Sequence, residues 1–421
     1  METESRVTFR TLGCKLNQAE SELLARQFAD AGYRVASGDK ADICVLNTCT
    51  VTHIADRKSR HLVRLLRKKN PEAFVIATGC YAERAPQELA QVGADLVVDN
   101  EQKMHLLELV RDKHSSALDC SAERHTINGV NRVRSFIKIQ DGCSDFCAYC
   151  IVPEVRRRKY CLPVAEVLSQ VKARASAGYR EVILTGTKIG VYEYDGASLS
   201  HLVQQILADT DVERLHLSSL QPQEISPELL SLWHDPRLCR HFHLALQSGS
   251  DAVLERMRRR YSTADYRRAV ALIREAVPGA AITTDVMVGF PGESCQEFEE
   301  SYLFCREIGF ANIHVFAYSR RPGTLAAKMP EQIHDRLKKQ RSLRMLELAQ
   351  ESVDKFRERF LGQNTVVLWE NEVAQGSGIY SGLSDNYIRV FTQSDWPLTR
   401  QLLAVRLVGL HGRGLWGEVS K

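Results

Sequence analysis

Apolar residues in the first 120 positions follow two alternating patterns. Short consecutive runs predict buried β-strands at Val7–Leu12, Ile43–Leu46, Phe74–Ala77 and Leu96–Val98. Between them, apolar residues recur every three or four positions, which predicts amphipathic helices at Ala19–Ala31 and Ile54–Lys69. Strands that alternate with helices form a parallel sheet covered on both faces, so we expect residues 1–120 to be a doubly wound α/β domain.

After a polar segment at about 115–132, interpreted as a linker, the same alternation resumes. Six further runs predict a β/α barrel with its active site at the carboxyl ends of the strands. They are Phe136–Ile139, Glu181–Leu184, Leu215–Leu217, His241–Leu246, Ile282–Val288 and Ile313–Phe316, and a long helix is expected at Ile333–Phe360.

Residues 361–421 are rich in glycine and β-branched residues. They predict a small β-barrel with strands at Thr365–Trp369, Tyr387–Phe391 and Leu403–Val408. The pattern therefore predicts an α/β protein with three domains, at 1–120, 133–360 and 361–421.

The composition indicates the cellular compartment in which the protein is expected. Of 421 residues, 44% are hydrophobic and 26% are charged, as in a folded globular protein. The polar start, Met1–Arg6, lacks the apolar run of a signal peptide, and no stretch approaches the ~18 apolar residues of a membrane span. We therefore expect a cytoplasmic protein. Its 12 cysteines then indicate metal binding or catalysis, because cytosolic thiols stay reduced.

The net charge of +4 is too small to indicate a partner by itself. Clusters of Lys and Arg do occur, at 57–69, 156–159, 256–260 and 336–344. Each cluster alone is typical of a solvated helix face or loop. The four together favour a polyanionic partner such as a nucleic acid.

One short loop contains three cysteines. Cys143, Cys147 and Cys150 have the spacing C-x3-C-x2-C and directly follow the first expected barrel strand. Three thiolates can bind three irons of a 4Fe-4S cube and leave the fourth iron open. Beside Tyr149, an open iron can chelate the amino and carboxylate groups of S-adenosylmethionine (SAM). A zinc site with one vacant position is the alternative for the same three ligands.

A second set of cysteines is spread along the first domain. Cys14, Cys49 and Cys80 each follow an expected parallel strand, and the carboxyl ends of such strands share one edge of the sheet. We therefore expect the three thiols to converge, although a lone cysteine at a strand end is usually a small buried hydrophobe. Gly13 and Gly79 precede two of them, where glycine allows the backbone to approach a cofactor. The others are interpreted as structural: Cys44, Cys120, Cys161, Cys239, Cys295 and Cys305.

Seven stretches, in order along the chain, resemble the radical SAM methylthiotransferase family. They are Thr11–Asn17, Phe136–Cys143, Leu184–Thr187, Leu217–Pro222, Leu246–Ser250, Val288–Glu293 and Tyr318–Thr324. The resemblance covers all three domains, and residues 382–390 are similar to part of the TRAM domain, an RNA-binding module. Because residues 363–421 are balanced in charge, any grip of that domain on RNA would rely on shape or on stacking by Tyr387 and Trp396.

The resemblance implies two 4Fe-4S clusters and SAM as cofactors. The cluster on Cys143, Cys147 and Cys150 would cleave SAM to methionine and a 5′-deoxyadenosyl radical, which abstracts hydrogen from an unactivated carbon. The cluster on Cys14, Cys49 and Cys80 would carry a sulfur, methylated by a second SAM, for delivery to that carbon. An electron donor such as flavodoxin or ferredoxin, and a sulfur source, are implied as partners.

The matching motifs also imply contacts to SAM. Tyr149, Gly186, Thr187, Ser218, Ser219, Gln247 and Asp285 are the candidates. Most carry a hydroxyl, amide or carboxylate at the expected carboxyl face of the barrel, and a capping or turn role is the alternative for each. His216, His243 and His314 alternate with apolar residues, which is typical of core or lumen histidines rather than metal ligands.

Gly13–Asn17 is similar to the family branch that modifies carbon 2 of N6-threonylcarbamoyladenosine, beside the anticodon of tRNA. Other branches act on isopentenyladenosine in tRNA or on an aspartate of a ribosomal protein. Two alternatives lie outside the family. One is a radical SAM enzyme of different chemistry, such as a lyase, which leaves Cys14, Cys49 and Cys80 unexplained. The other is a non-catalytic RNA-binding protein with structural metal sites.

Two positions depart from the family pattern. Arg157 stands where the family commonly has glycine, and Ala245 stands where it commonly has proline. Arg157 adds charge and bulk where a glycine would allow another group to approach the backbone closely. We therefore expect the substitution to affect the local geometry near the substrate entrance.

Overall fold

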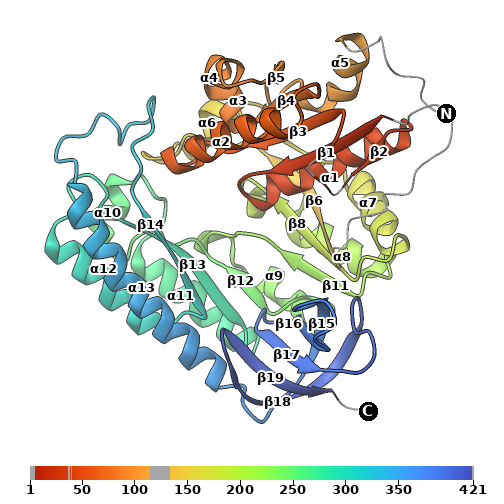
Figure 1. Ribbon diagram of the computed structural model, residues 1–421. Coiled ribbons are helices and arrows are strands. Elements are labelled where there is room, and N and C mark those ends of the chain that lie inside the picture. The colour runs from red at the N-terminus through yellow and green to blue at the C-terminus, as the bar shows by residue number, and fades with distance from the viewer. Residues whose placement is uncertain (1–4, 37, 39, 114–132, 420–421) are drawn as a thin grey trace. The chain divides into compact units, whose positions relative to one another are not determined.

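The computed structural model describes residues 5–36, 38, 40–113 and 133–419 (Figure 1). The chain packs into two compact units. The first contains the described residues up to 113 together with 141–160 and 319–327. The second contains 133–140, 161–318 and 328–419. The three-domain division stays a prediction, and the expected linker at about 115–132 lies outside the described residues.

The first unit is built on a five-stranded parallel sheet with the strand order β2-β1-β3-β4-β5. Its strands are β1 (Arg6–Thr11), β2 (Arg34–Val35), β3 (Ile43–Thr48), β4 (Phe74–Gly79) and β5 (Leu96–Val98). Four of them were predicted. β2 was not, because two residues are too short to show a periodic pattern.

Alternate residues of the central strand pack on opposite faces of this sheet. Ile43 and Val45 join one apolar cluster, whereas Cys44 and Leu46 join the other. Helices supply the rest of both clusters: α1 (Lys15–Asp30) and α5 (Leu106–Lys113) on one face, and α2 (His53–Lys69), α3 (Cys80–Arg84) and α4 (Pro86–Gln91) on the other. The doubly wound α/β prediction is confirmed, with Cys44 fully buried as a core residue.

The second unit contains the predicted series of parallel strands. The six are β6 (Arg134–Asp141), β8 (Glu181–Gly186), β11 (Arg214–Leu217), β12 (His241–His243), β13 (Ala281–Val288) and β14 (Asn312–Ala317). β6, β8 and β11 are neighbours in one sheet, with β7 (Tyr160–Cys161) beside β6, and β12, β13 and β14 form another. A parallel bridge between Leu220 and Leu244 connects β11 to β12, so the strands form a part-open barrel wall.

Helices cover the outer side of this wall. Alternate strand residues, such as Val182, Leu217 and Ile282, join them in one large apolar cluster. In Figure 1, α11, α12 and α13 lie along the β12–β14 side. The helices of eight or more residues are α7 (Val164–Ser176), α8 (Leu199–Asp209), α11 (Thr263–Ala276), α12 (Cys295–Ile308) and α13 (Asp335–Glu358). Among the described residues, no helix is both long and apolar enough to cross a membrane.

The chain ends in the expected small β-barrel, which is closed. Its strands are β15 (Asn364–Glu372), β16 (Ile379–Ser384), β17 (Arg389–Gln393), β18 (Leu402–His411) and β19 (Gly414–Val419). The predicted strand at Tyr387–Phe391 starts later, at Arg389. β16 and β19 were missed because their internal glycines, Gly382 and Gly417, interrupt the apolar pattern. A Cβ on either glycine would lie within 2.4 Å of another strand, so closure of the barrel requires both.

Tyr387 attaches the small barrel to the parallel strands within the second unit. Its ring stacks on His241, with centroids 4.5 Å apart and an interplanar angle of 17°, and its hydroxyl donates a hydrogen bond to Glu181. Burial raises the pKa of the Tyr387 hydroxyl well above its ordinary value. The expectation that Tyr387 stacks on RNA is therefore wrong, because the ring is already packed inside the protein. Trp396 remains 50% exposed.

Candidate metal centres and cofactor site

The structure brings Cys14, Cys49 and Cys80 together at one edge of the first sheet. Cys14 caps the start of α1, Cys49 directly follows β3, and Cys80 begins α3 after β4. Burial, together with the neighbouring Cys80 and Cys14, raises the pKa of the Cys49 thiol to about 12. Iron removes such a proton, since a coordinating thiol is deprotonated by the metal. Three thiols at three neighbouring strand ends are the kind of ligand set that a cluster with one thiolate on each of three irons needs, and their role as ligands stays a prediction.

The backbone conformation and the close packing of neighbouring segments require glycine before Cys14 and Cys80. Gly13 and Gly79 have φ values of +108° and +95°, which disfavour other residues. A Cβ on Gly13 would lie 2.9 Å from the Cys49 Cβ, and one on Gly79 would lie 2.3 Å from the Asn47 Oδ1. The close approach is therefore to neighbouring protein segments, which allows the cysteine-bearing turns to pack against each other.

The loop with Cys143, Cys147 and Cys150 follows β6 and belongs to the same compact unit. All three cysteines are half-buried. The Cys150 amide donates to the Cys147 carbonyl at 3.0 Å, and the Ala148 carbonyl accepts from the Ala326 amide at 2.7 Å. The loop is thus held in a turn that keeps its thiols partly accessible, as a cluster with one open iron requires. Tyr149 is half-buried in this turn.

The two cysteine sets are packed within one unit. Ile151 and Val155, just after the loop, form a buried apolar cluster with Cys80. The Asn100 side chain donates a 2.6 Å hydrogen bond to the Val155 carbonyl. The sets are therefore neighbours in the packing of the first unit, although the sequence assigns them to separate domains.

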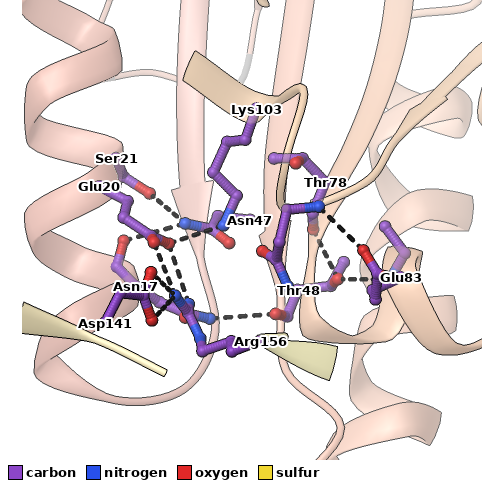
Figure 2. A network of polar contacts seen from close by, with 12 residues as sticks. Asn17, Glu20, Ser21, Asn47, Thr48, Thr78, Glu83, Lys103, Asp141 and Arg156 are labelled. Carbon is purple, nitrogen blue, oxygen red and sulfur yellow. Dashed lines mark hydrogen bonds and ion pairs between the residues drawn. The ribbon is translucent and has the colours of Figure 1, made fainter. Parts of the chain in front are cut away.

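Sequence reasoning missed a buried polar network beside both sets (Figure 2). At its centre is the guanidinium of Arg156, which is 5% exposed and contacts Asn17, Glu20 and Asp141. Lys103, 1% exposed, donates at 2.6 Å to the Glu20 Oε2, which also accepts from Arg156. Removing one partner of a buried ion pair costs about 3–5 kcal/mol. One sequence signal could have indicated this network: Asn17 and Glu20 are polar residues on the helix face that the apolar pattern of α1 predicts to be buried.

The other candidate SAM contacts lie in the second unit, on adjacent strands at the carboxyl side. Gly186 ends β8, Thr187 follows it, and Ser218 and Ser219 directly follow β11. Gln247 lies beside β13, where its amide donates to the Asp285 carbonyl at 2.8 Å. The shared location agrees with the expected SAM face, while the individual contacts stay predictions.

Two of these residues have features that favour a ligand. Ser218 is 4% exposed, and its hydroxyl has no hydrogen-bond partner among the described residues. A buried hydroxyl without a partner is costly unless a ligand or water satisfies it. Gln247 has a φ of +69°, and such non-glycine strain concentrates at functional sites. Both observations fit a polar ligand at this end of the strands.

Asp285 already has a protein partner. Its carboxylate lies 3.3 Å from the Nε2 of His243, whose Nδ1 lies 3.1 Å from the Thr283 hydroxyl. His216 similarly lies 2.8 Å from His241. The contacts of His243 agree with its interpretation as a satisfied histidine. One oxygen of the Asp285 carboxylate lies beside His243, and the contact of Asp285 to SAM stays a prediction.

Neither departure from the family pattern distorts the chain. Arg157 is exposed, does not have a positive φ, and donates through Nε to the Glu154 carbonyl at 3.0 Å. The Ala245 amide donates to the Leu220 carbonyl at 3.2 Å, a bond that proline cannot make. The added bulk at Arg157 therefore points away from the packed core of the loop.

The four basic clusters differ in whether their side chains are paired within the protein. Arg156 is buried, Arg256 pairs with Glu297, and Arg341 and Arg344 pair with Glu293 and Glu299. On α2, by contrast, a stripe of exposed side chains makes no ion pair or hydrogen bond with described residues: Arg57, His61, Arg64 and Lys68. This stripe is one free basic surface among the described residues of the first unit.

Comparison with known proteins places the chain in a family. Residues 6–99 match a family described as "Uncharacterized protein family UPF0004", and residues 137–305 match the Radical SAM superfamily. Threonylcarbamoyladenosine tRNA methylthiotransferase MtaB of Aquifex aeolicus is 38% identical over 91% of this chain and 96% of its own. The enzyme of that name from Bacillus subtilis is 33% identical over 96% and 93%. The tRNA-2-methylthio-N(6)-dimethylallyladenosine synthase of Syntrophotalea carbinolica is 32% identical over 97% and 98%.

A solved structure supports the fold. The radical S-adenosylmethionine methyltransferase TsrM from Kitasatospora setae, with cobalamin and a [4Fe-4S] cluster bound, matches 90% of this chain and 81% of its own with a TM-score of 0.56 at 15% identity. The fold and the sequence relatives define a radical SAM methylthiotransferase, an enzyme that uses SAM and 4Fe-4S clusters. Within that class, the chain belongs to the family of threonylcarbamoyladenosine tRNA methylthiotransferases.

Proposed function

We propose that this protein adds a methylthio group to carbon 2 of N6-threonylcarbamoyladenosine next to the anticodon of tRNA. The observation that carries the proposal is the packing of two cysteine triads in one compact unit, in a chain 33–38% identical to relatives named for this reaction. Relatives named for dimethylallyladenosine are 28–32% identical. Both groups act on tRNA by name, which favours tRNA over a ribosomal protein.

The two triads divide the work. When bound, the clusters supply the electron for SAM cleavage, at Cys143, Cys147 and Cys150, and the sulfur for transfer, at Cys14, Cys49 and Cys80. The turn around Ala148 holds the triad of Cys143, Cys147 and Cys150 partly open to solvent. Burial of Cys49 and Cys80 shields the triad to which they belong. In the second unit, Ser218, Gln247 and the Asp285–His243 pair offer hydrogen-bonding groups for the ribose and methionyl parts of SAM.

The proposal includes the cell's supply of electrons and sulfur. A flavodoxin or ferredoxin delivers the electrons, a separate sulfur source restores the transferred atom, and the reaction takes place in the cytoplasm. These partners follow from the chemistry, since each turnover consumes an electron for SAM cleavage and one sulfur atom.

A substrate choice experiment tests the proposal. The reconstituted protein is incubated with SAM, a strong reductant and tRNA carrying either threonylcarbamoyladenosine or isopentenyladenosine, and digested nucleosides are analysed by mass spectrometry. We expect the methylthio mass increase on threonylcarbamoyladenosine. Modification of isopentenyladenosine alone would support the other tRNA branch, and absence of both products with bound zinc would support the non-catalytic alternative.

The α2 stripe predicts where the tRNA backbone binds. Changing Arg57, Arg64 and Lys68 together to Gln removes three unpaired cations, so fewer counterions are released on association. We expect tRNA affinity to fall roughly tenfold and the slope of log affinity against log salt to decrease by about three. Filter binding at several salt concentrations measures both quantities.

Arg67 is excluded from this variant because the structure gives it another role. It donates hydrogen bonds to the carbonyls of Pro71 and Ala73 at 2.9 and 2.8 Å and pairs with Asp95, so it holds the turn after α2. A matched control changes Arg111, Lys172 and Arg306, which are exposed on other helices, to Gln with the same loss of charge. If the two triple variants weaken tRNA binding equally, α2 is an ordinary solvated helix face and not a specific tRNA-binding surface.

A further inference from the structure

Arg156 contacts two chain segments that border the cysteines, α1 and the end of β6. Its Nη2 donates to the Asn17 Oδ1 at 2.9 Å and to the Glu20 Oε2 at 3.1 Å, both on α1, which begins at Cys14. Its Nη1 donates to the two Asp141 oxygens at 3.0 and 2.9 Å, at the end of β6. Cys143 lies two residues after Asp141. One planar guanidinium therefore spans the segments of both cysteine sets.

Asn17, which accepts from Arg156, also contacts the backbone beside Cys14 and Cys49. Its side-chain amide donates to the Leu12 carbonyl at 2.8 Å and to the Thr48 carbonyl at 3.0 Å. These carbonyls lie just before the Gly13–Cys14 turn and Cys49. The Cys14 sulfur lies 3.8 Å from the Asn17 Oδ1, the atom that also accepts from Arg156. Figure 2 shows the contacts that join Asn17 to Arg156 and to Thr48.

The charges of this network balance without a ligand. Arg156 and Lys103 are cations, and Glu20 and Asp141 are anions, with side chains 10% exposed or less. Asp141 also accepts from the Gly142 amide at 2.8 Å, which orients the first residue of the loop. Because every charge is paired inside the protein, the network is built to hold geometry rather than to bind an anion.

We propose that Arg156 is a positioning residue that sets the separation between the two cysteine triads, and so couples radical formation to sulfur transfer. This inference rests on the proposed function. A positioned partner captures a reactive group before side reactions do, and an error of about 1 Å in such geometry can cost about 100-fold in rate. Lysine keeps the charge of Arg156, but as a single point donor it cannot span Asn17, Glu20 and Asp141 together.

Arg156→Lys tests the inference, with Arg157→Lys as the matched control at the exposed neighbour. We expect Arg156→Lys to fold and to keep its iron, while the amount of 5′-deoxyadenosine formed per methylthio group rises about tenfold. A role in stability alone would lower both products in parallel and leave this ratio unchanged. Arg157→Lys should match the unaltered protein.

A spectroscopic measurement tests the same inference without turnover. The magnetic interaction between two reduced clusters depends on their separation, so the electron paramagnetic resonance spectrum of Arg156→Lys should differ from that of the unaltered protein. An unchanged spectrum and product ratio would overturn the inference. If Arg156→Lys loses iron, Glu20→Gln, which keeps the side-chain shape, is measured instead, and an unchanged ratio and spectrum there overturn it equally. If the unaltered protein forms no methylthio nucleoside, the proposed function fails, and the spectra still decide the role of Arg156.

Discussion

A variant with Cys14 and Cys49 both changed to Ala is expected to cleave SAM yet form no methylthiolated nucleoside. Only Cys80 of the first triad then remains, and one thiolate does not hold a cube. Reconstituted iron should fall from roughly eight atoms per chain to roughly four. The radical is still made, but the sulfur donor beside it is missing, so 5′-deoxyadenosine is the expected product.

The structure determines this choice of residues. Cys80 packs with Ile151 and Val155, which follow the second triad, so replacing it would disturb both triads at once. Cys14 is exposed and Cys49 lies at a strand end, so their loss leaves that packing in place. A variant with Cys44→Ala and Cys305→Ala serves as the control for loss of two cysteines, because both are core residues. Methylthiolation at the normal rate by the Cys14 and Cys49 variant would refute the sulfur-carrying role.

Replacing Cys147 by Ala is expected to abolish SAM cleavage. A cube held by Cys143 and Cys150 alone would be lost or displaced, and its open iron could not chelate SAM. The first triad is intact in this variant, so about half of the reconstituted iron should remain. Chromatographic measurement of 5′-deoxyadenosine under a strong reductant gives the result, and production at the normal rate would contradict the role assigned to the loop.

The positions of the six candidate cysteine ligands were predictable because each depends on a local rule. Cys14, Cys49 and Cys80 follow strands that their apolar runs reveal, and parallel strands bring their carboxyl ends to one edge. The loop cysteines are a compact motif. The six strands of the second unit were predictable for the same reason, since each buries one face under helices and so carries a readable apolar pattern.

What escaped prediction depends on contacts between distant residues. From the sequence, Arg156 was interpreted as one residue of a basic cluster. Glu20 and Asp141 are distant in the sequence, and only the folded chain brings them next to it. From the sequence, Arg67 was interpreted as part of the same α2 surface as Arg64. In the structure it pairs with Asp95 and donates to three carbonyls, those of Pro71, Ala73 and Gly93. Tyr387 was predicted as the first residue of a strand and as an aromatic that could stack on RNA, whereas its ring and hydroxyl are occupied by partners on β8 and β12.

The most direct test of the central claim is the nucleoside content of tRNA in cells with and without the gene. Mass spectrometry of digested tRNA should show 2-methylthio-N6-threonylcarbamoyladenosine only when the gene is present, with unmodified N6-threonylcarbamoyladenosine accumulating in its absence. Complementation with the unaltered gene should restore the methylthio nucleoside, and complementation with Cys147→Ala should not. An unchanged level of that nucleoside after deletion of the gene would contradict the account.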